Sequence, residues 1–286
     1  MTLPDTSLLI ADSGSTKTDW AVCRLTGCDF MTTPGLNPFM QQPGEMADTL
    51  RHELLPALHG TTVKAVRFYG AGCRGQGARD MAALLGGLFP GADVEVESDL
   101  LGAARALCGR REGIACILGT GSNSGLYDGQ AIVRQTPSLG YVLGDEGSGA
   151  TLGRRLVSDA LKGALGDDLA DAFRRETGLA VDTAIERVYR APYPNRFLAS
   201  FAPFLHAHRE HPEIHLILLE EFRRFFRRNI APYARRELPV GFVGSIALHF
   251  ADEVREAAAA EAFTVGAIQK SPLPLLVEYH QDDKGN

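Results

Sequence analysis

The sequence is poor in cysteine, has no long apolar run and carries no excess of basic charge. Its 286 residues include five cysteines, an odd number, and no C-x-x-C pair. A disulfide framework or zinc site is therefore not expected, whereas reduced thiols in a cytoplasmic protein are. No stretch of 18 apolar residues is present and residues 1–5 do not begin a signal peptide, which excludes a membrane partner. The formal net charge of -6 argues against a nucleic-acid partner.

Apolar runs that alternate with helical patterns place the chain in the α/β class. Strands are expected at residues 8–11, 20–25, 63–69, 94–96, 114–118 and 240–244, the first two as a hairpin. Helices are expected at residues 46–58, 99–107, 151–165, 169–177, 181–189, 196–206, 220–229 and 246–261. The pattern changes from strand-rich to helix-rich near Gly119, which indicates a domain boundary there.

Three glycine-rich turns share one chemistry. Residues 12–18, 119–123 and 144–149 each join glycine to Ser, Thr, Asp or Asn after an apolar segment. Glycine lets the backbone approach a ligand closely, and consecutive N–H groups can bind an anion. A single turn of this kind is ordinary hairpin chemistry, but three in one chain favour a polyphosphate site. The P-loop, Rossmann and protein-kinase motifs are all absent.

Four segments resemble motifs of the actin, Hsp70 and sugar-kinase superfamily. Residues 9–20 resemble its first phosphate motif, residues 117–124 its second, and residues 241–247 its adenosine motif. Residues 143–149 are similar to the branch of N-acetylglucosamine kinases and BadF/BadG/BcrA/BcrD-type ATPases. The resemblance implies two ribonuclease-H-like (actin-like ATPase) domains with a cleft between them. Their expected limits are residues 1–118 with the returning segment 271–286, and residues 119–270.

The same resemblance implies the site residues. ATP would be bound by Ser13, Gly14, Ser15, Thr16, Lys17, Thr18, Gly119, Thr120, Gly121 and Ser122, with Gly244 and Ser245 near the adenosine. Mg²⁺ would be held by Asp12. The sugar would be bound by Asn37, Asp99, Thr120 and Asp145. Asn37 precedes a proline, however, and that pair is also ordinary turn chemistry.

Phosphoryl transfer needs a base that takes the proton of the acceptor hydroxyl. Asp99 is the candidate because it lies where a strand meets a helix, the context in which related sugar kinases place this aspartate. The alternative is that Ser98 or Asp99 only caps the helix.

The implied function is ATP-dependent phosphorylation of a small amino sugar, first of all N-acetylglucosamine to its 6-phosphate, in a homodimer. N-acetylmuramic acid and glucosamine are competing substrates. A BadF-type ATPase activator is disfavoured because no cysteine follows Cys116 to bind an iron–sulfur cluster. The four histidines between residues 206 and 215 are not expected to hold a metal, because Pro212 interrupts the helix that would align them.

Overall fold

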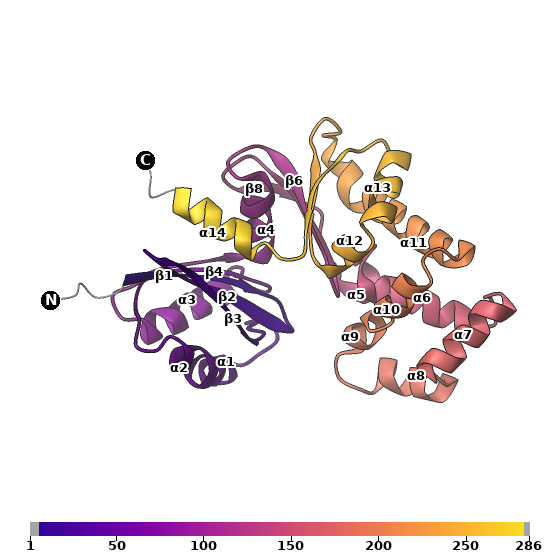
Figure 1. The fold of residues 1–286 in the computed structure, drawn as a ribbon, viewed down its shortest axis with the longest axis horizontal. Coiled ribbons are helices and arrows are strands. Elements are labelled where there is room, and N and C mark those ends of the chain that lie inside the picture. The colour runs from indigo at the N-terminus through magenta and orange to yellow at the C-terminus, as the bar shows by residue number, and fades with distance from the viewer. Residues whose placement is uncertain (1–5, 283–286) are drawn as a thin grey trace. The chain divides into compact units, whose positions relative to one another are not determined.

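The chain divides into two compact units. A computed structural model describes residues 6–282 (Figure 1). The first unit comprises the chain up to Arg111, residues 129–132 and the segment from Ser271 onward. The second unit comprises residues 112–128 and 133–270.

The first unit is built on a mixed sheet. Its strands are β1 (Thr6–Ser13), β2 (Lys17–Arg24), β3 (Gly27–Pro34), β4 (Thr62–Gly70) and β5 (Asp93–Ser98). Their order in space is β3-β2-β1-β4-β5. The first three form an antiparallel meander, whereas β4 and β5 run parallel to β1. The β1–β2 turn and the end of β5 carry the predicted phosphate and base residues.

Helices cover both faces of this sheet (Figure 1). On one face lie α1 (Pro43–Thr49), a π-helical turn (Leu50–Leu54), α2 (Leu55–Ala57) and α3 (Gln76–Leu88). On the other face lie α4 (Asp99–Cys108) and α14 (Leu273–Asp282), which meet Leu8, Ile10 and Ala21. Because α14 completes this second layer, this helix belongs to the core of the first unit.

The second unit repeats the same strand order. Its strands are β6 (Gly113–Leu118), β7 (Ser122–Tyr127), β8 (Ile132–Gln135), β9 (Val240–Val243) and β10 (Val265–Gln269). Their order in space, β8-β7-β6-β9-β10, matches that of the first sheet, with β6 antiparallel to β7 and parallel to β9. The turn after β6 is thus the counterpart of the turn after β1, although the sequence shows no internal repeat.

Helices make up most of the second unit. They are α5 (Gly140–Leu143), α6 (Gly149–Leu161), α7 (Asp167–Thr177), α8 (Val181–Tyr189), α9 (Pro194–Ala199), α10 (Ala202–Ala207), α11 (Pro212–Phe225), a π-helical turn (Phe226–Ile230), a 3₁₀ turn (Ala231–Tyr233), α12 (Ser245–His249) and α13 (Ala251–Ala260). A single core cluster joins them to the sheet, and in it Phe222, Phe225 and Phe226 are fully buried. These phenylalanines fix the end of α11 against β9.

The predicted α/β class and the predicted strands are confirmed, but two predicted helices are each broken in two. The segment 196–206 forms α9 and α10, and 246–261 forms α12 and α13. Pro203 lies in the first turn of α10, where its missing N–H costs no hydrogen bond, whereas in a continuous helix it would remove one. The break at Phe250 has non-helical dihedrals, and its side chain is fully buried.

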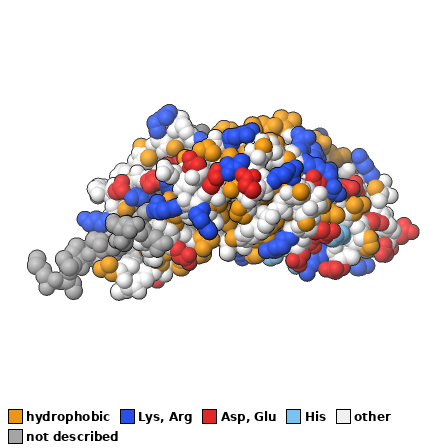
Figure 2. Space-filling model, turned by 90° about the horizontal axis from the view of Figure 1, so that it is seen from above, with side chains coloured by type: hydrophobic (Ala, Val, Ile, Leu, Met, Phe, Trp, Pro, Cys, Tyr) orange, Lys and Arg blue, Asp and Glu red, His pale blue; other side chains and the backbone are white. Residues whose placement is uncertain are grey.

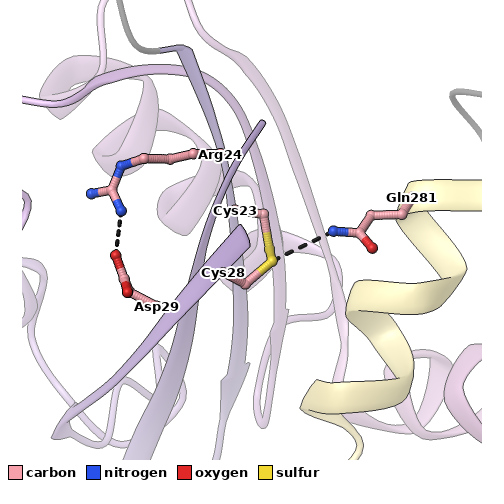
Figure 3. Close-up of a disulfide and its surroundings, with 5 residues drawn as sticks. All are labelled: Cys23, Arg24, Cys28, Asp29 and Gln281. Carbon is pink, nitrogen blue, oxygen red and sulfur yellow. Dashed lines mark hydrogen bonds and ion pairs between the residues drawn. A yellow bond between two sulfur atoms is a disulfide. The ribbon is translucent and has the colours of Figure 1, made fainter. Parts of the chain in front are cut away.

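One prediction about the cysteines is wrong. Cys23 and Cys28 face each other across β2 and β3 and form a disulfide, with a Cα–Cα distance of 4.0 Å (Figure 3). The pair escapes a search for C-x-x-C spacing, because the tight turn of the hairpin brings together residues five apart. Cys73, Cys108 and Cys116 are not part of a disulfide. The cytoplasmic location, which relied on reduced thiols, stays a prediction.

The surface is mixed in charge. On the face shown in Figure 2, Lys and Arg side chains are interspersed with Asp and Glu. Between residues 6 and 282, no helix combines the length and the apolar character that crossing a membrane requires.

Candidate active site

The β1–β2 turn is polar, and buried hydroxyl groups at its two ends stabilise it. Ser13 and Thr18 are fully buried; their hydroxyls share a hydrogen bond of 2.7 Å, and Ser13 Oγ also donates to Leu36 O at 2.9 Å. The tip is closed by Gly14 N, which donates to Lys17 O at 2.9 Å. Residues 14–17 are all exposed. The two buried hydroxyls therefore shape the turn, and the residues between them present backbone and side-chain donors.

Two aspartates at the ends of the parallel strands β1 and β5, which lie on either side of β4, form the electrostatic centre of the first unit. Burial, together with the charges of Asp99 and Asp19, raises the pKa of Asp12 to about 7. Burial likewise raises the pKa of Asp99, against a hydrogen bond from Leu100 N and the charge of Arg74. Carboxylates crowded in this way are stabilised by a cation, and oxygen donors suit Mg²⁺.

The structure separates the helix cap from the candidate base. Ser98 is the N-cap of α4, and its Oγ accepts a hydrogen bond from Leu101 N at 3.2 Å. Asp99 is the first residue of the helix, and its Oδ1 accepts from Leu100 N at 2.8 Å. Asp99 is therefore not needed as the cap, and its catalytic role stays a prediction.

Asn37 lies beside the phosphate turn but is buried. Its Nδ2 donates to Ser15 Oγ at 2.8 Å, while its Oδ1 accepts from Phe39 N at 3.0 Å. Both ends of the amide are engaged within the protein, as the turn alternative for Asn37 requires. These bonds do not test the predicted contact of Asn37 with a sugar, which stays a prediction.

The second unit gathers its own predicted residues at the ends of β6 and β9. Gly119 N donates to Gly121 O, closing the turn between β6 and β7. Asp145 is buried, has a left-handed backbone (φ 57°) and accepts a hydrogen bond from Ser122 N at 3.2 Å. Burial raises its pKa. Gly244 (φ 120°) packs so closely on β6 that an added Cβ would lie 2.1 Å from Leu118 O.

A cavity of about 470 Å³ opens beside these residues, entirely within the second unit. Gly119, Thr120 and Ser245 line it together with Ala199, Ser200, Ala202, Pro203, His206, Ile246, His249 and Phe250. The wall is largely apolar with a few polar groups, which is the usual make-up of a cofactor pocket, and the volume falls in the usual range. The structure thus brings the second phosphate motif and the adenosine motif to one cavity.

Sequence reasoning missed the two imidazoles of this cavity. His206 and His249 meet edge to face, with ring centroids 5.5 Å apart. Of the other clustered histidines, His208 contacts Glu176 and His215 contacts Glu256. The cluster therefore splits between different partners, and only its first member lies at the cavity. The spacing of these residues in the sequence gives no signal of this.

The predicted site residues fall into two groups. The first unit holds the turn at residues 12–18 with Asn37 and Asp99, and the second holds residues 119–122, 145 and 244–245.

Solved structures with the same fold identify the family. A candidate N-acetylglucosamine kinase from Porphyromonas gingivalis is 44% identical, with a TM-score of 0.94 over 97% of this chain and 99% of that one. The chain belongs to the N-acetylglucosamine kinase family. This is a family of sugar kinases, and the chain shares its actin-like fold with ROK family kinases.

More distant structures share the fold. A second candidate N-acetylglucosamine kinase, from Chromobacterium violaceum, is 21% identical with a TM-score of 0.76, over 97% of this chain and 99% of that one. A ROK family glucokinase from Streptomyces griseus, solved with glucose and AMPPNP, is 15% identical with a TM-score of 0.55, over 93% and 95% of the two chains. No family model matches the chain, and no curated protein does.

Proposed function

We propose that this chain transfers the γ-phosphoryl group of ATP to the O6 hydroxyl of N-acetylglucosamine. The observation that carries the proposal is the 44% identity, over nearly the whole of both chains, to the Porphyromonas gingivalis protein. The cavity lined by both the second phosphate turn and the adenosine motif supports the nucleotide half of the reaction.

The nucleotide is assigned to the second unit. Its adenine would occupy the apolar cavity between α10 and α12, with the phosphates leading toward Gly119 and Thr120. The tight packing of Gly244 on Leu118 O keeps α12 close to the end of β6. In the first unit, the exposed tip at residues 14–17 would donate N–H and hydroxyl groups to phosphate oxygens.

Mg²⁺ is assigned to Asp12. The residues fit the ion, because burial and the charges of Asp99 and Asp19 disfavour the ionised form of Asp12, which a bound cation would favour. Within residues 6–282, no three His, Cys, Asp or Glu side chains are grouped so that they could hold a metal by themselves. Mg²⁺ commonly uses one or two carboxylates together with water and substrate phosphates. When bound, it would neutralise phosphate charge.

Asp99 is assigned as the general base. A carboxylate takes a hydroxyl proton more effectively when its pKa lies closer to the working pH, and burial raises the pKa of Asp99 in that direction. The bond from Leu100 N at the start of α4 orients the carboxylate. The proposal requires residues of both units to act on the same ATP and sugar.

The test uses a panel of sugars and one matched pair of variants. ADP release is measured with ATP and Mg²⁺ on N-acetylglucosamine, N-acetylmuramic acid, glucosamine, glucose and N-acetylmannosamine, and without sugar. Asp99→Asn should retain ATP binding by calorimetry but lose at least about a hundredfold in kcat. Asp93→Asn, at the exposed beginning of β5, the strand that leads into Asp99, is the control and should keep the wild-type rate. If the wild type released ADP equally fast with every sugar and without sugar, the kinase proposal would be refuted.

A further inference from the structure

The segment from Thr136 to Ser148 holds Asp145 at one end of a surface loop. Its middle part contains the short helix α5, and there Leu139, Val142 and Leu143 are 58%, 65% and 69% exposed. Ser138 Oγ donates to Ser122 O at 3.1 Å, but the exposed apolar side chains of α5 contribute little to holding the segment. Asp145 has a left-handed backbone, which for a residue other than glycine costs energy and persists only where surrounding contacts enforce it. The position of Asp145 therefore depends on its hydrogen bonds with Ser122, Ser148 and Thr151 and on the anchors at the two ends of the loop.

The anchor beside Asp145 is an ion pair whose carboxylate is buried and whose arginine is partly exposed. Glu146 is 5% exposed; its Oε1 lies 2.7 Å from Arg228 Nε, and its Oε2 accepts a hydrogen bond from Asn229 Nδ2 at 3.2 Å. A buried carboxylate is stable only when such partners satisfy it. Both partners come from the π-helical turn at the end of α11. A π-turn within a helix frequently marks a functional site.

The other end of the loop is anchored to the same π-helical turn and to the 3₁₀ turn that follows it. Thr136 Oγ1 donates to Asn229 O at 2.9 Å, and Thr136 N donates to Tyr233 OH at 2.9 Å. Ser124 Oγ, on β7, also donates to Asn229 O at 3.3 Å. The π-helical turn thus forms hydrogen bonds with both ends of the loop and with one strand of the sheet.

We propose that Arg228 and Asn229 are positioning residues that hold the sugar-binding loop, and with it Asp145, in the geometry that binds the sugar. The inference rests on the proposed function for the identity of the ligand. Neither residue needs to touch the substrate, because each acts through Glu146 or Thr136. The nucleotide cavity shares no lining residue with this network, so ATP binding should be independent of it.

The chain supplies a matched control at the neighbouring position. Arg227 lies on the same π-helical turn, its side chain is 57% exposed against 58% for Arg228, and its ion pair with Glu261 has the same length of 2.7 Å. Glu261 lies outside the loop, directly after α13. Arg227→Ala therefore removes an equivalent ion pair without touching the loop anchor, and any general cost of losing an arginine from this turn appears in both variants.

The kinetic test compares Arg228→Ala, Arg228→Lys and Arg227→Ala. Loss of one charge-assisted hydrogen bond to the loop carboxylate should raise the KM for N-acetylglucosamine by about tenfold in Arg228→Ala. The KM for ATP should not change. Arg228→Lys keeps the charge and should recover part of the sugar KM, while Arg227→Ala should match wild type. Equal sugar KM values for Arg228→Ala and Arg227→Ala, or equal rises in both KM values, would overturn the proposal.

A second readout does not depend on the identity of the substrate. Amide hydrogen exchange of residues 137–148, measured without ligand, should be faster in Arg228→Ala than in wild type or Arg227→Ala. Unchanged exchange there would show that Arg228 does not anchor the loop. If wild type phosphorylates none of the sugars, the proposed function fails and the sugar role of the loop fails with it. A wild type that is active, with Arg228→Ala indistinguishable from Arg227→Ala, would refute only the positioning role.

Discussion

A buried histidine on α14 forms a hydrogen bond with the sheet of the first unit, and its protonation should lower the free energy of unfolding of that unit. His280 is 8% exposed, and its Nε2 lies 2.8 Å from the hydroxyl of Tyr69 on β4. That hydroxyl already accepts a hydrogen bond from Arg105 Nη1 at 2.6 Å, so its own proton is directed at His280. The imidazole therefore acts as a neutral acceptor, and a proton on Nε2 would break the bond.

The pKa of His280 gives the size of the effect. Burial, helped by the charges of Arg105, Arg67 and Arg110 and opposed by that of Glu95, lowers this pKa from 6.5 to about 4. As the pH falls, the unfolded chain binds this proton first. The stability from the neutral histidine is therefore complete above the unfolded pKa and is lost as the pH falls toward the folded one. The loss is about 2 kcal/mol at pH 5 and about 3 kcal/mol at pH 4.

The measurement uses the single tryptophan of the chain. Trp20 is fully buried in the core of the same unit, so its fluorescence reports unfolding of that unit in urea. His280→Gln keeps an acceptor for Tyr69 but binds no proton in this range. Between pH 8 and pH 5, wild type should lose about 2 kcal/mol more than this variant. His52→Gln, at an exposed position of the same unit, is the control and should behave like wild type. An equal loss in wild type and His280→Gln would refute the argument.

Three further predictions follow from the site and the hairpin. Gly244→Ala should destabilise the second unit by more than about 2 kcal/mol and abolish ATP binding, because the added Cβ would meet Leu118 O at a residue with positive φ. The control is Gly86→Ala on α3, where an added Cβ meets no other atom, and urea unfolding should show no loss of stability in this variant. Thiol titration of the unfolded, unreduced protein should find three thiols, and five after reduction; five from the outset would contradict the Cys23–Cys28 disulfide. In a kcat profile, activity should fall on the acid side, because protonated Asp99 cannot accept a proton and burial raises its pKa; a flat profile would argue against this base.

Strands and helices with a clear hydrophobic period were predictable, and those without one were not. The predicted helix at residues 181–189 is α8, and the strand at residues 63–69 lies within β4. In contrast, β3 is an edge strand in which only Thr33 is buried, so its sequence carries no alternating pattern. The equal strand order of the two sheets was also invisible, since topology depends on how strands pair and not on residue identity.

The predicted site residues came from local motifs, and the missed ones from distant parts of the chain. The turns at Gly14 and Gly119 can be predicted from their composition, which combines glycine with Ser and Thr. The partners of Glu146 do not, because Asn229 lies 83 residues away and only folding brings the two together. His206 is similar: nothing near it in the sequence indicates that it would share a cavity with His249. Tertiary contacts of this kind have no sequence pattern of their own.

The central claim is that the chain phosphorylates N-acetylglucosamine at O6. Proton–phosphorus correlation NMR of a reaction with ATP, Mg²⁺ and this sugar tests it most directly. The account predicts a new phosphomonoester signal coupled to the C6 protons of the sugar, absent when Asp99→Asn replaces wild type. A phosphoryl group on another hydroxyl would contradict the assigned position, and inorganic phosphate as the only product would contradict the claim itself.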